Sequence, residues 1–183
     1  MRLIASLAAF AALAACSTPF GNALDTRQNA GPCPPTGSLY DAARIVEFGG
    51  DSKTYNNITY TGEIVDVRLF CRYADDDDMD VELEVDFAFG RGELGAAESH
   101  NFDYFVAVTR RSGKVLAKEM FTVQADFSDG PVTGESTLIR PITVPRVDES
   151  ISGANFEVLV GFVLTEEQVD FNRGGNRFRL DVQ

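Results

Sequence analysis

The chain has 183 residues, of which 44% are hydrophobic, and a formal net charge of −12 at pH 7. This charge argues against binding to nucleic acid and against electrostatic docking on anionic lipid, because both need basic surfaces. The length beyond the N-terminal segments described below fits one domain with a single hydrophobic core.

Residues 1–15 have the form of a secretory signal peptide. Arg2 supplies a positive charge, and residues 3–15 form an apolar stretch that ends on small residues. This stretch is shorter than the roughly 20 residues that a membrane-spanning helix needs. The run Leu-Ala-Ala-Cys at 13–16 resembles the lipobox of bacterial lipoproteins. That resemblance implies cleavage before Cys16.

The resemblance to lipoproteins also implies an anchor and a location. In that family the cysteine thiol is diacylated and the new amino group is usually acylated, typically with palmitate, which places the lipid on Cys16. Two or three chains hold a protein on a membrane firmly, since each buried methylene contributes about 0.8 kcal/mol. Ser17, and not aspartate, follows the cysteine. By resemblance to the lipoprotein sorting rule, this favours the periplasmic face of the outer membrane, with the inner membrane as the alternative.

The chain contains three cysteines, and lipid on Cys16 leaves Cys33 and Cys71. An exported protein enters an oxidising compartment, where two remaining thiols are expected to pair. We therefore expect a Cys33–Cys71 disulfide. A redox or metal role is disfavoured because the chain has no C-x-x-C spacing and a single histidine.

Residues 16–37 predict a lipidated N-terminus followed by a flexible tether. Prolines, glycines and asparagines interrupt every periodicity there. A flexible segment of about twenty residues has an r.m.s. span of roughly 25 Å. The folded domain is expected at 38–183.

Strand patterns dominate the expected domain. Residues 42–48 predict a short strand, and residues 79–89 alternate strictly between apolar and other side chains, which predicts a half-buried strand. Ile58–Tyr73 predicts another long strand, in which the inward-facing parity switches near Gly62. A β-bulge at that glycine would account for the switch.

A hairpin and an edge strand are expected next. Residues 102–110 and 115–125 flank a short turn in which Gly113 can adopt a positive φ. Val132–Val144 predicts a further strand. Pro141 and Pro145 remove backbone donors there, which places that strand at a sheet edge.

The C-terminal region predicts two more strands and one short helix. Residues 156–164 are apolar on both faces, which is typical of a central strand, and residues 177–182 predict a last short strand. Between them, Thr165 is a good N-cap, Gln168 completes a capping box, and glycines from Gly174 onward stop the helix.

About eight strands with one short C-terminal helical turn predict an all-β fold. We expect an antiparallel β-sandwich, immunoglobulin-like in general form, with a closed β-barrel as the alternative. The chain has no tryptophan, so the core pattern of a true immunoglobulin domain is absent.

A cluster of carboxylates is the sharpest candidate for chemistry. It consists of Asp75, Asp76, Asp77, Asp78 and Asp80. Carboxylate oxygens are ligands that Ca²⁺ takes, but consecutive aspartates between two strands point in divergent directions, and the glycine and bidentate glutamate of an EF-hand loop are missing. We expect a solvated turn, with weak cation binding as the alternative, and no cofactor.

His100 is the single histidine of the chain, so any mechanism that uses a histidine must pass through it. Residues 90–101 are rich in glycine, alanine and glutamate, which predicts a loop with a solvated histidine. The segment carries no nucleophile motif and no phosphate-binding glycine pattern. We therefore expect a protein that is not an enzyme.

Basic residues gather at the tip of the predicted hairpin. Arg110, Arg111 and Lys114 are candidates for contact with an anionic partner such as a lipid headgroup, a glycan or a protein loop. Ordinary solubilising charge that blunts an edge or turn is the alternative.

Three further segments have a family likeness. They are Cys33-Pro34, Arg68-Leu69-Phe70-Cys71-Arg72, and Val160-Gly161-Phe162 followed by residues 164–168. Together they resemble small envelope lipoproteins of proteobacteria whose function is uncharacterised. The resemblance carries no activity and no functional residues over to this chain.

The sequence thus favours a membrane-anchored periplasmic lipoprotein that acts as a non-enzymatic binding or structural module. Its expected partners are the membrane, through lipid, and another envelope protein or a glycan, but not nucleic acid. One alternative is a carrier of a small ligand or lipid, which would need an apolar cavity of several hundred Å³. The other is a hydrolase that uses a pair of carboxylates, which would need two converging acids.

Overall fold

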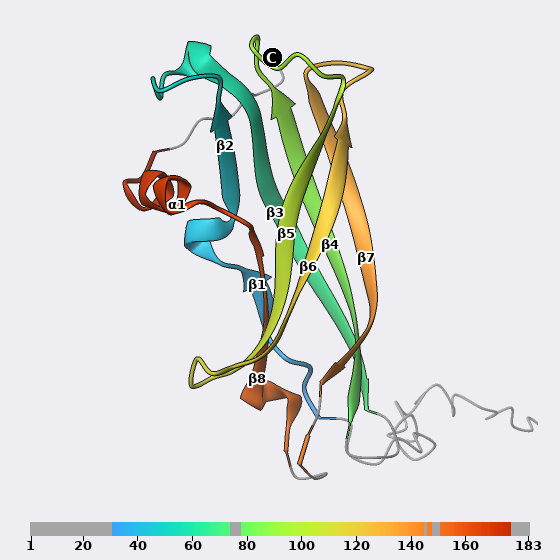
Figure 1. Cartoon of the computed structure of the whole chain (residues 1–183). Coiled ribbons are helices and arrows are strands. Elements are labelled where there is room, and N and C mark those ends of the chain that lie inside the picture. The colour runs from blue at the N-terminus through green and yellow to red at the C-terminus, as the bar shows by residue number, and fades with distance from the viewer. Residues whose placement is uncertain (1–30, 74–77, 145, 148–150, 177–183) are drawn as a thin grey trace, which may run out of the picture.

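The computed structural model describes residues 31–73, 78–144, 146–147 and 151–176. Within them the chain forms two four-stranded sheets that pack face to face (Figure 1). The predicted all-β sandwich is therefore confirmed, and the described sheets do not close into a barrel. The expected signal peptide, the lipidation site at Cys16, most of the tether and the strand at 177–182 lie outside the described residues.

The elements follow one another in chain order as a series of strands that ends in one helix. They are β1 (Thr36–Ser38), β2 (Arg44–Phe48), β3 (Ile58–Tyr73), β4 (Met79–Arg91), β5 (Ser99–Arg110), β6 (Val115–Asp126), β7 (Val132–Val144), β8 (Phe156–Phe162) and α1 (Glu166–Arg173), with short 3₁₀ turns at Tyr40–Ala42, Tyr55–Asn57 and Gly153–Asn155.

One sheet has the order β1-β8-β5-β6 and the other β2-β3-β4-β7. Strand β1 pairs with β8 in parallel, and all other described pairs are antiparallel. This order differs from that of an immunoglobulin domain, so the likeness ends at the sandwich form. None of the helices in the described part of the chain has the length and apolarity needed to cross a membrane.

Two sequence predictions about strand position are confirmed. Strand β7, which contains Pro141, lies at a sheet edge, and its register shifts where it passes that proline. Pro145 lies outside the described residues. Strand β8 is central, between β1 and β5, although Val163 just beyond it remains 38% exposed.

The bulge in β3 lies three residues beyond the predicted position. The register shifts between Ile64 and Asp66, and the extra residue, Val65, is 61% exposed. Gly62 instead pairs regularly with Phe89. A Cβ atom at Gly62 would come within 2.9 Å of Ile45, so this glycine permits close packing in the core and does not mark the bulge.

Both sheets contribute aromatic side chains to the core. The rings of Phe89 and Phe102 stack at 4.5 Å, and those of Phe87 and Tyr104 meet edge to face at 5.0 Å. Each pair joins β4 to β5, and therefore joins the two sheets. Such pairs add about 0.5–1.5 kcal/mol beyond the burial of their area.

The folded domain begins earlier than the expected boundary at Ser38. Strand β1 already pairs Thr36 with Val158. The Tyr73 hydroxyl donates a hydrogen bond to the Pro32 carbonyl at 2.8 Å. The predicted Cys33–Cys71 disulfide is present, with 5.6 Å between its Cα atoms, and it joins the start of the domain to β3.

Candidate functional site

Hydrogen bonds in the first turn of helix α1 fix where the helix begins. The Thr165 hydroxyl accepts a hydrogen bond from the Gln168 backbone N–H at 3.2 Å, and the Gln168 side-chain oxygen accepts one from the Thr165 N–H at 2.9 Å. This is the predicted capping box. Glu166 and Glu167 in the first turn favour the positive end of the helix dipole.

The helix covers the outer edge of β2 with two side-chain amides. Gln168 donates to the Val46 carbonyl at 3.4 Å, and Asn172 donates to the carbonyls of Arg44 and Asp41, both at 2.8 Å. Residues four apart on a helix rise about 6 Å. Residues two apart on a strand span about 6.7 Å. The two spacings match, so α1 supplies donors to an edge that would otherwise be open to another strand.

Asn172 is the residue that we expect to hold α1 on β2. It is only 2% exposed. Replacement by aspartate removes both donors and sets a carboxylate against two carbonyl oxygens, so Asn172→Asp should lower the free energy of unfolding by about 3 kcal/mol. Urea unfolding measures the change. The matched control is Asn176→Asp at an exposed position, expected to cost under about 1 kcal/mol, and equal costs at the two sites would refute the assignment.

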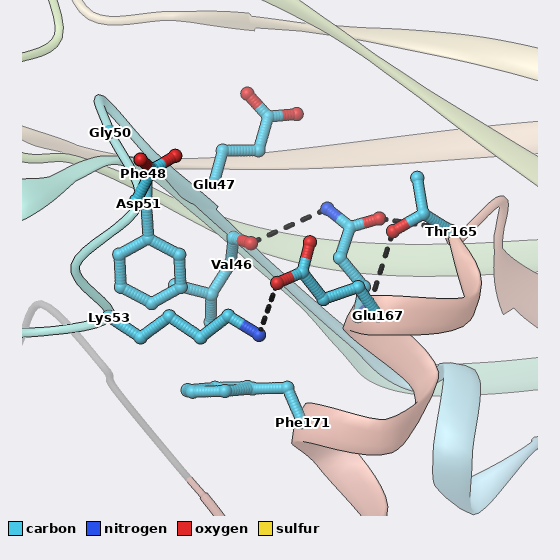
Figure 2. A pocket seen from close by; sticks show the side chains of 10 residues that line it. Val46, Glu47, Phe48, Gly50, Asp51, Lys53, Thr165, Glu167 and Phe171 are labelled. Atoms are coloured by element: carbon cyan, nitrogen blue, oxygen red, sulfur yellow. Dashed lines mark hydrogen bonds and ion pairs between the residues drawn. The ribbon is translucent and has the colours of Figure 1, made fainter.

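A groove of about 360 Å³ lies between β2, the loop that follows it, and α1 (Figure 2). Its lining residues are Val46, Glu47, Phe48, Gly50, Asp51, Lys53, Thr165, Glu167, Gln168 and Phe171. The rings of Phe48 and Phe171 meet edge to face at 5.6 Å. Phe48 belongs to β2 and Phe171 to α1, so each of the two elements contributes a ring to the lining.

The groove is acidic and already holds one cation. The Lys53 ammonium lies 2.8 Å from a Glu167 carboxylate oxygen and 5.7 Å from the centre of the Phe171 ring (Figure 2). A second, adjoining hollow shares Lys53, Glu167 and Phe171 with the groove. Among the described residues that line the two hollows, Lys53 is the one basic side chain, and the acidic ones are Glu47, Asp51, Glu166, Glu167 and Asp170.

This arrangement suits a positively charged group. A cation over an aromatic face gains about 0.5–1 kcal/mol at an exposed site. Carboxylates on the rim attract the same group. The groove can therefore bind an ammonium or a guanidinium, and the position of Lys53 shows how such a group would sit.

His100 does not lie in a loop, and this corrects the sequence prediction. It belongs to β5, which begins at Ser99, and its ring stacks on Tyr60 at 3.9 Å. Its Nε2 atom lies 3.0 Å from a Glu47 carboxylate oxygen, without the alignment of a hydrogen bond. His100 shares its strand parity with Phe102, which could have revealed its inward position. Its contacts join the two sheets at the rim of the groove.

The described residues of the aspartate cluster do not form a metal site. Asp75, Asp76 and Asp77 lie outside them, Asp78 is exposed, and Asp80 lies 3.8 Å from Arg72. Across 31–73, 78–144, 146–147 and 151–176, no three or more histidine, cysteine, aspartate or glutamate side chains are placed to hold a metal ion.

Carboxylates do converge on the outer face of the β2-β3-β4-β7 sheet, but around an arginine. Arg68 contacts Asp66, Glu84 and Asp86 there. The hydrogen bond from Arg68 lowers the pKa of Asp86. A general acid for glycoside hydrolysis needs a raised pKa, so this cluster does not favour the hydrolase alternative.

The basic hairpin lies away from the groove. Gly113 has a φ of +84° at the tip, as predicted. The Arg110 guanidinium lies over the Phe156 ring at 5.6 Å, and the Arg111 backbone N–H donates to the Asn155 carbonyl at 3.1 Å. Lys114 is exposed. None of these basic residues lines the groove.

Sequence patterns do not predict the groove residues of β2 and its following loop. One signal was present: Gln168, Phe171 and Asn172 lie on one face of α1 at helical spacing, and such a face needs a surface to pack against. Comparisons with protein-family models, with curated proteins and with solved structures gave no match. The case for a function therefore rests on the geometry of the groove.

Proposed function

We propose that this protein is a non-enzymatic binding module of the bacterial envelope. Lipid on Cys16 holds it on the periplasmic face of the outer membrane, and the groove between β2 and α1 binds a partner protein. The partner presents an extended segment that carries a basic side chain next to an aromatic or aliphatic one.

The observation that supports this proposal most strongly is the position of the Lys53 side chain. Its ammonium lies between a Glu167 carboxylate and the Phe171 ring, in a groove whose other charged side chains are Glu47 and Asp51. The Lys53 side chain is 36% exposed and the Glu167 side chain is 75% exposed, and such pairs contribute about 0–1 kcal/mol. A competing cation therefore displaces Lys53 at little cost.

The point at which the described chain enters the fold is compatible with a membrane anchor. Tyr73 links the Pro32 carbonyl to the Gly153 N–H, so the chain enters the fold at the end of the sandwich opposite the β2–β3 turn (Figure 1). Residues 17–32 reach at most about 55 Å when extended. A module on such a tether can meet a partner that is itself fixed in the membrane or wall.

The carrier alternative receives no comparable support. Among the described residues, a hollow lined by Val106, Val108, Phe121 and Ile142, together with the exposed Lys118 and Glu119, holds about 30 Å³. This is room for one water molecule and not for a lipid chain or a small ligand.

Charge reversal in the groove tests the proposal. The wild-type chain should co-purify with an envelope protein from solubilised membranes. We expect Asp51→Lys/Glu167→Lys to lower the amount of that protein at least about tenfold, because two repulsive contacts replace two attractive ones. The control, Glu119→Lys/Asp129→Lys, changes the net charge equally at exposed sites outside the groove and should retain the partner. Equal retention by both variants, or equal loss, would rule the groove out as the binding site.

A further inference from the structure

Strand β6 lies at the edge of its sheet and is exposed over most of its length. Among the described strands it pairs with β5 alone, because it ends the order β1-β8-β5-β6. It contains no proline and no glycine, and Val115 and Met120 are 55% and 56% exposed. A long edge strand of this kind presents a row of backbone donors and acceptors with which another strand can pair.

The three other edges of the two sheets carry features that limit such pairing. Strand β1 has only three residues, and β7 contains Pro141, which has no backbone N–H to donate. Helix α1 covers the edge of β2 with the side-chain amides of Gln168 and Asn172. Among the described strands, β6 is therefore the one long edge without a proline or a covering helix.

The ladder between β5 and β6 shows which residues of β6 face the open edge. The Phe127 N–H donates to the Glu98 carbonyl at 2.6 Å, and the same register continues without a shift up to the pair Val108–Ala117. Because hydrogen-bonded and non-hydrogen-bonded pairs alternate in an antiparallel ladder, the odd-numbered residues of β6 bond to β5. The even-numbered residues, such as Met120, therefore direct their N–H and C=O groups to the open edge.

A second copy of β6 can pair with this edge in the antiparallel direction about a two-fold axis. The axis stands perpendicular to the joined sheet, so residues of equal parity lie opposite each other. A register centred on Lys118 or on Glu119 sets two like charges directly opposite each other, which is unfavourable. The register centred on Met120 avoids both conflicts, because it sets Lys118 opposite Thr122 of the second copy and Glu119 opposite Phe121.

The register centred on Met120 also brings opposite charges together on the outer face of the joined sheet. Thr122 pairs with Asp103 of β5 and donates to its carboxylate at 2.6 Å. Lys118 of one copy thus lies two strands from Asp103 of the other, about 10 Å between Cα atoms, which a long lysine side chain bridges. In the single chain the Lys118 ammonium lies over the Phe105 ring at 4.1 Å, so pairing exchanges that ring for a carboxylate.

The same register continues an apolar row across the axis. Met120 pairs with Phe105 of β5, whose side chain is partly exposed on the outer face. Two Met120 residues on the axis therefore stand between two Phe105 rings, and methionine makes favourable contacts with aromatic rings. A register centred on Phe121 sets Met120 opposite Thr122 and Lys118 opposite Gln124, so it loses both this row and the charge pairs.

We propose that two copies of this chain pair through β6 about a two-fold axis at Met120. Their β1-β8-β5-β6 sheets then form one continuous sheet, and the open edge of each copy is removed. No residue of β6 lines the groove between β2 and α1, so the dimer carries two separate grooves. A partner with two basic segments would gain avidity from them. That last consequence rests on the function proposed above, whereas the pairing does not.

A cysteine on the axis tests the pairing in the full chain. In the Cys16→Ser background, Met120→Cys supplies one free thiol, because Cys33 and Cys71 form a disulfide. Opposed residues in a hydrogen-bonded pair have Cα atoms about 5.5 Å apart, which suits a disulfide. We expect mild oxidation to give at least about fivefold more linked dimer than from Thr122→Cys, whose two thiols lie about 13 Å apart along the strands.

Two outcomes would overturn the inference. One is an equal yield of linked dimer from Met120→Cys and Thr122→Cys, and the other is a native Met120→Cys yield no higher than that in urea, where only chance encounters link the chains. Unchanged urea unfolding midpoints establish that both variants are folded. Partner retention in the co-purification experiment is scored separately, so the pairing and the proposed function can fail independently.

A charge exchange tests the register. In the same Met120→Cys background, Lys118→Glu should lower the yield of linked dimer at least about threefold, because a glutamate then faces Asp103 of the second copy. Asp103→Lys should lower the yield likewise, and the two substitutions together should restore it. Within one chain Lys118 pairs with Ala107, four residues or about 13 Å along β5 from Asp103, so restoration requires two copies. A combined variant that links as poorly as the single ones contradicts the inference.

Discussion

Replacing Cys33 by serine should lower the free energy of unfolding by about 4 kcal/mol. The Cys33–Cys71 disulfide joins residues 38 positions apart, and the chain-entropy model assigns about this stabilisation to a loop of that length. The bridge also holds the entry of the chain against β3. Strand β1, with only three paired residues, depends on that attachment.

Urea unfolding without reductant measures this effect. Cys33→Ser, Cys71→Ser and the double variant should all lose the same stability, because each removes the same covalent bond. Wild-type protein with reductant should match them. Free, alkylatable thiols at both positions in the untreated protein, or full stability after reduction, would contradict the role of the bridge.

Replacing Cys16 by serine should remove the protein from the membrane fraction. A hydroxyl accepts no thioether-linked lipid, so the variant lacks the chains whose burial contributes about 0.8 kcal/mol per methylene. Because two or three chains bind a bilayer far more tightly than one, the loss should be nearly complete. Fractionation followed by mass measurement reports both location and acylation.

Cys33→Ser is the matched control for this experiment, since it also replaces a cysteine by serine but leaves Cys16 in place. It should stay with the membrane and keep the acyl mass. Membrane association that survives Cys16→Ser would defeat the interpretation of residues 13–16 as a lipobox.

Local sequence patterns predict most of the strands and the helix. The bounds of β3 and β7 follow from alternation and turn residues alone, and the capping box fixed the start of α1 at Glu166. These features depend on residues within a few positions of one another. A pattern of period two or a cap can therefore be recognised without knowing the partner strand.

The features that the sequence does not predict depend on contacts between residues far apart in the chain. Strand β1 has three residues, too few to show a period, and it forms because Thr36 pairs with Val158, far along the chain. The composition around His100 predicts a loop, but pairing with Ala125 extends β5 over it. The groove joins Val46 to Gln168, so no local pattern could place its two walls together.

A photo-crosslinking residue at position 51 tests most directly whether the groove is the binding site in the intact envelope. We predict an intermolecular adduct with one envelope protein from position 51, no such adduct from the control position 129, and loss of the adduct in the Glu167→Lys variant. The same adduct from both positions, no adduct from position 51, or an adduct that persists in Glu167→Lys would contradict the proposed function.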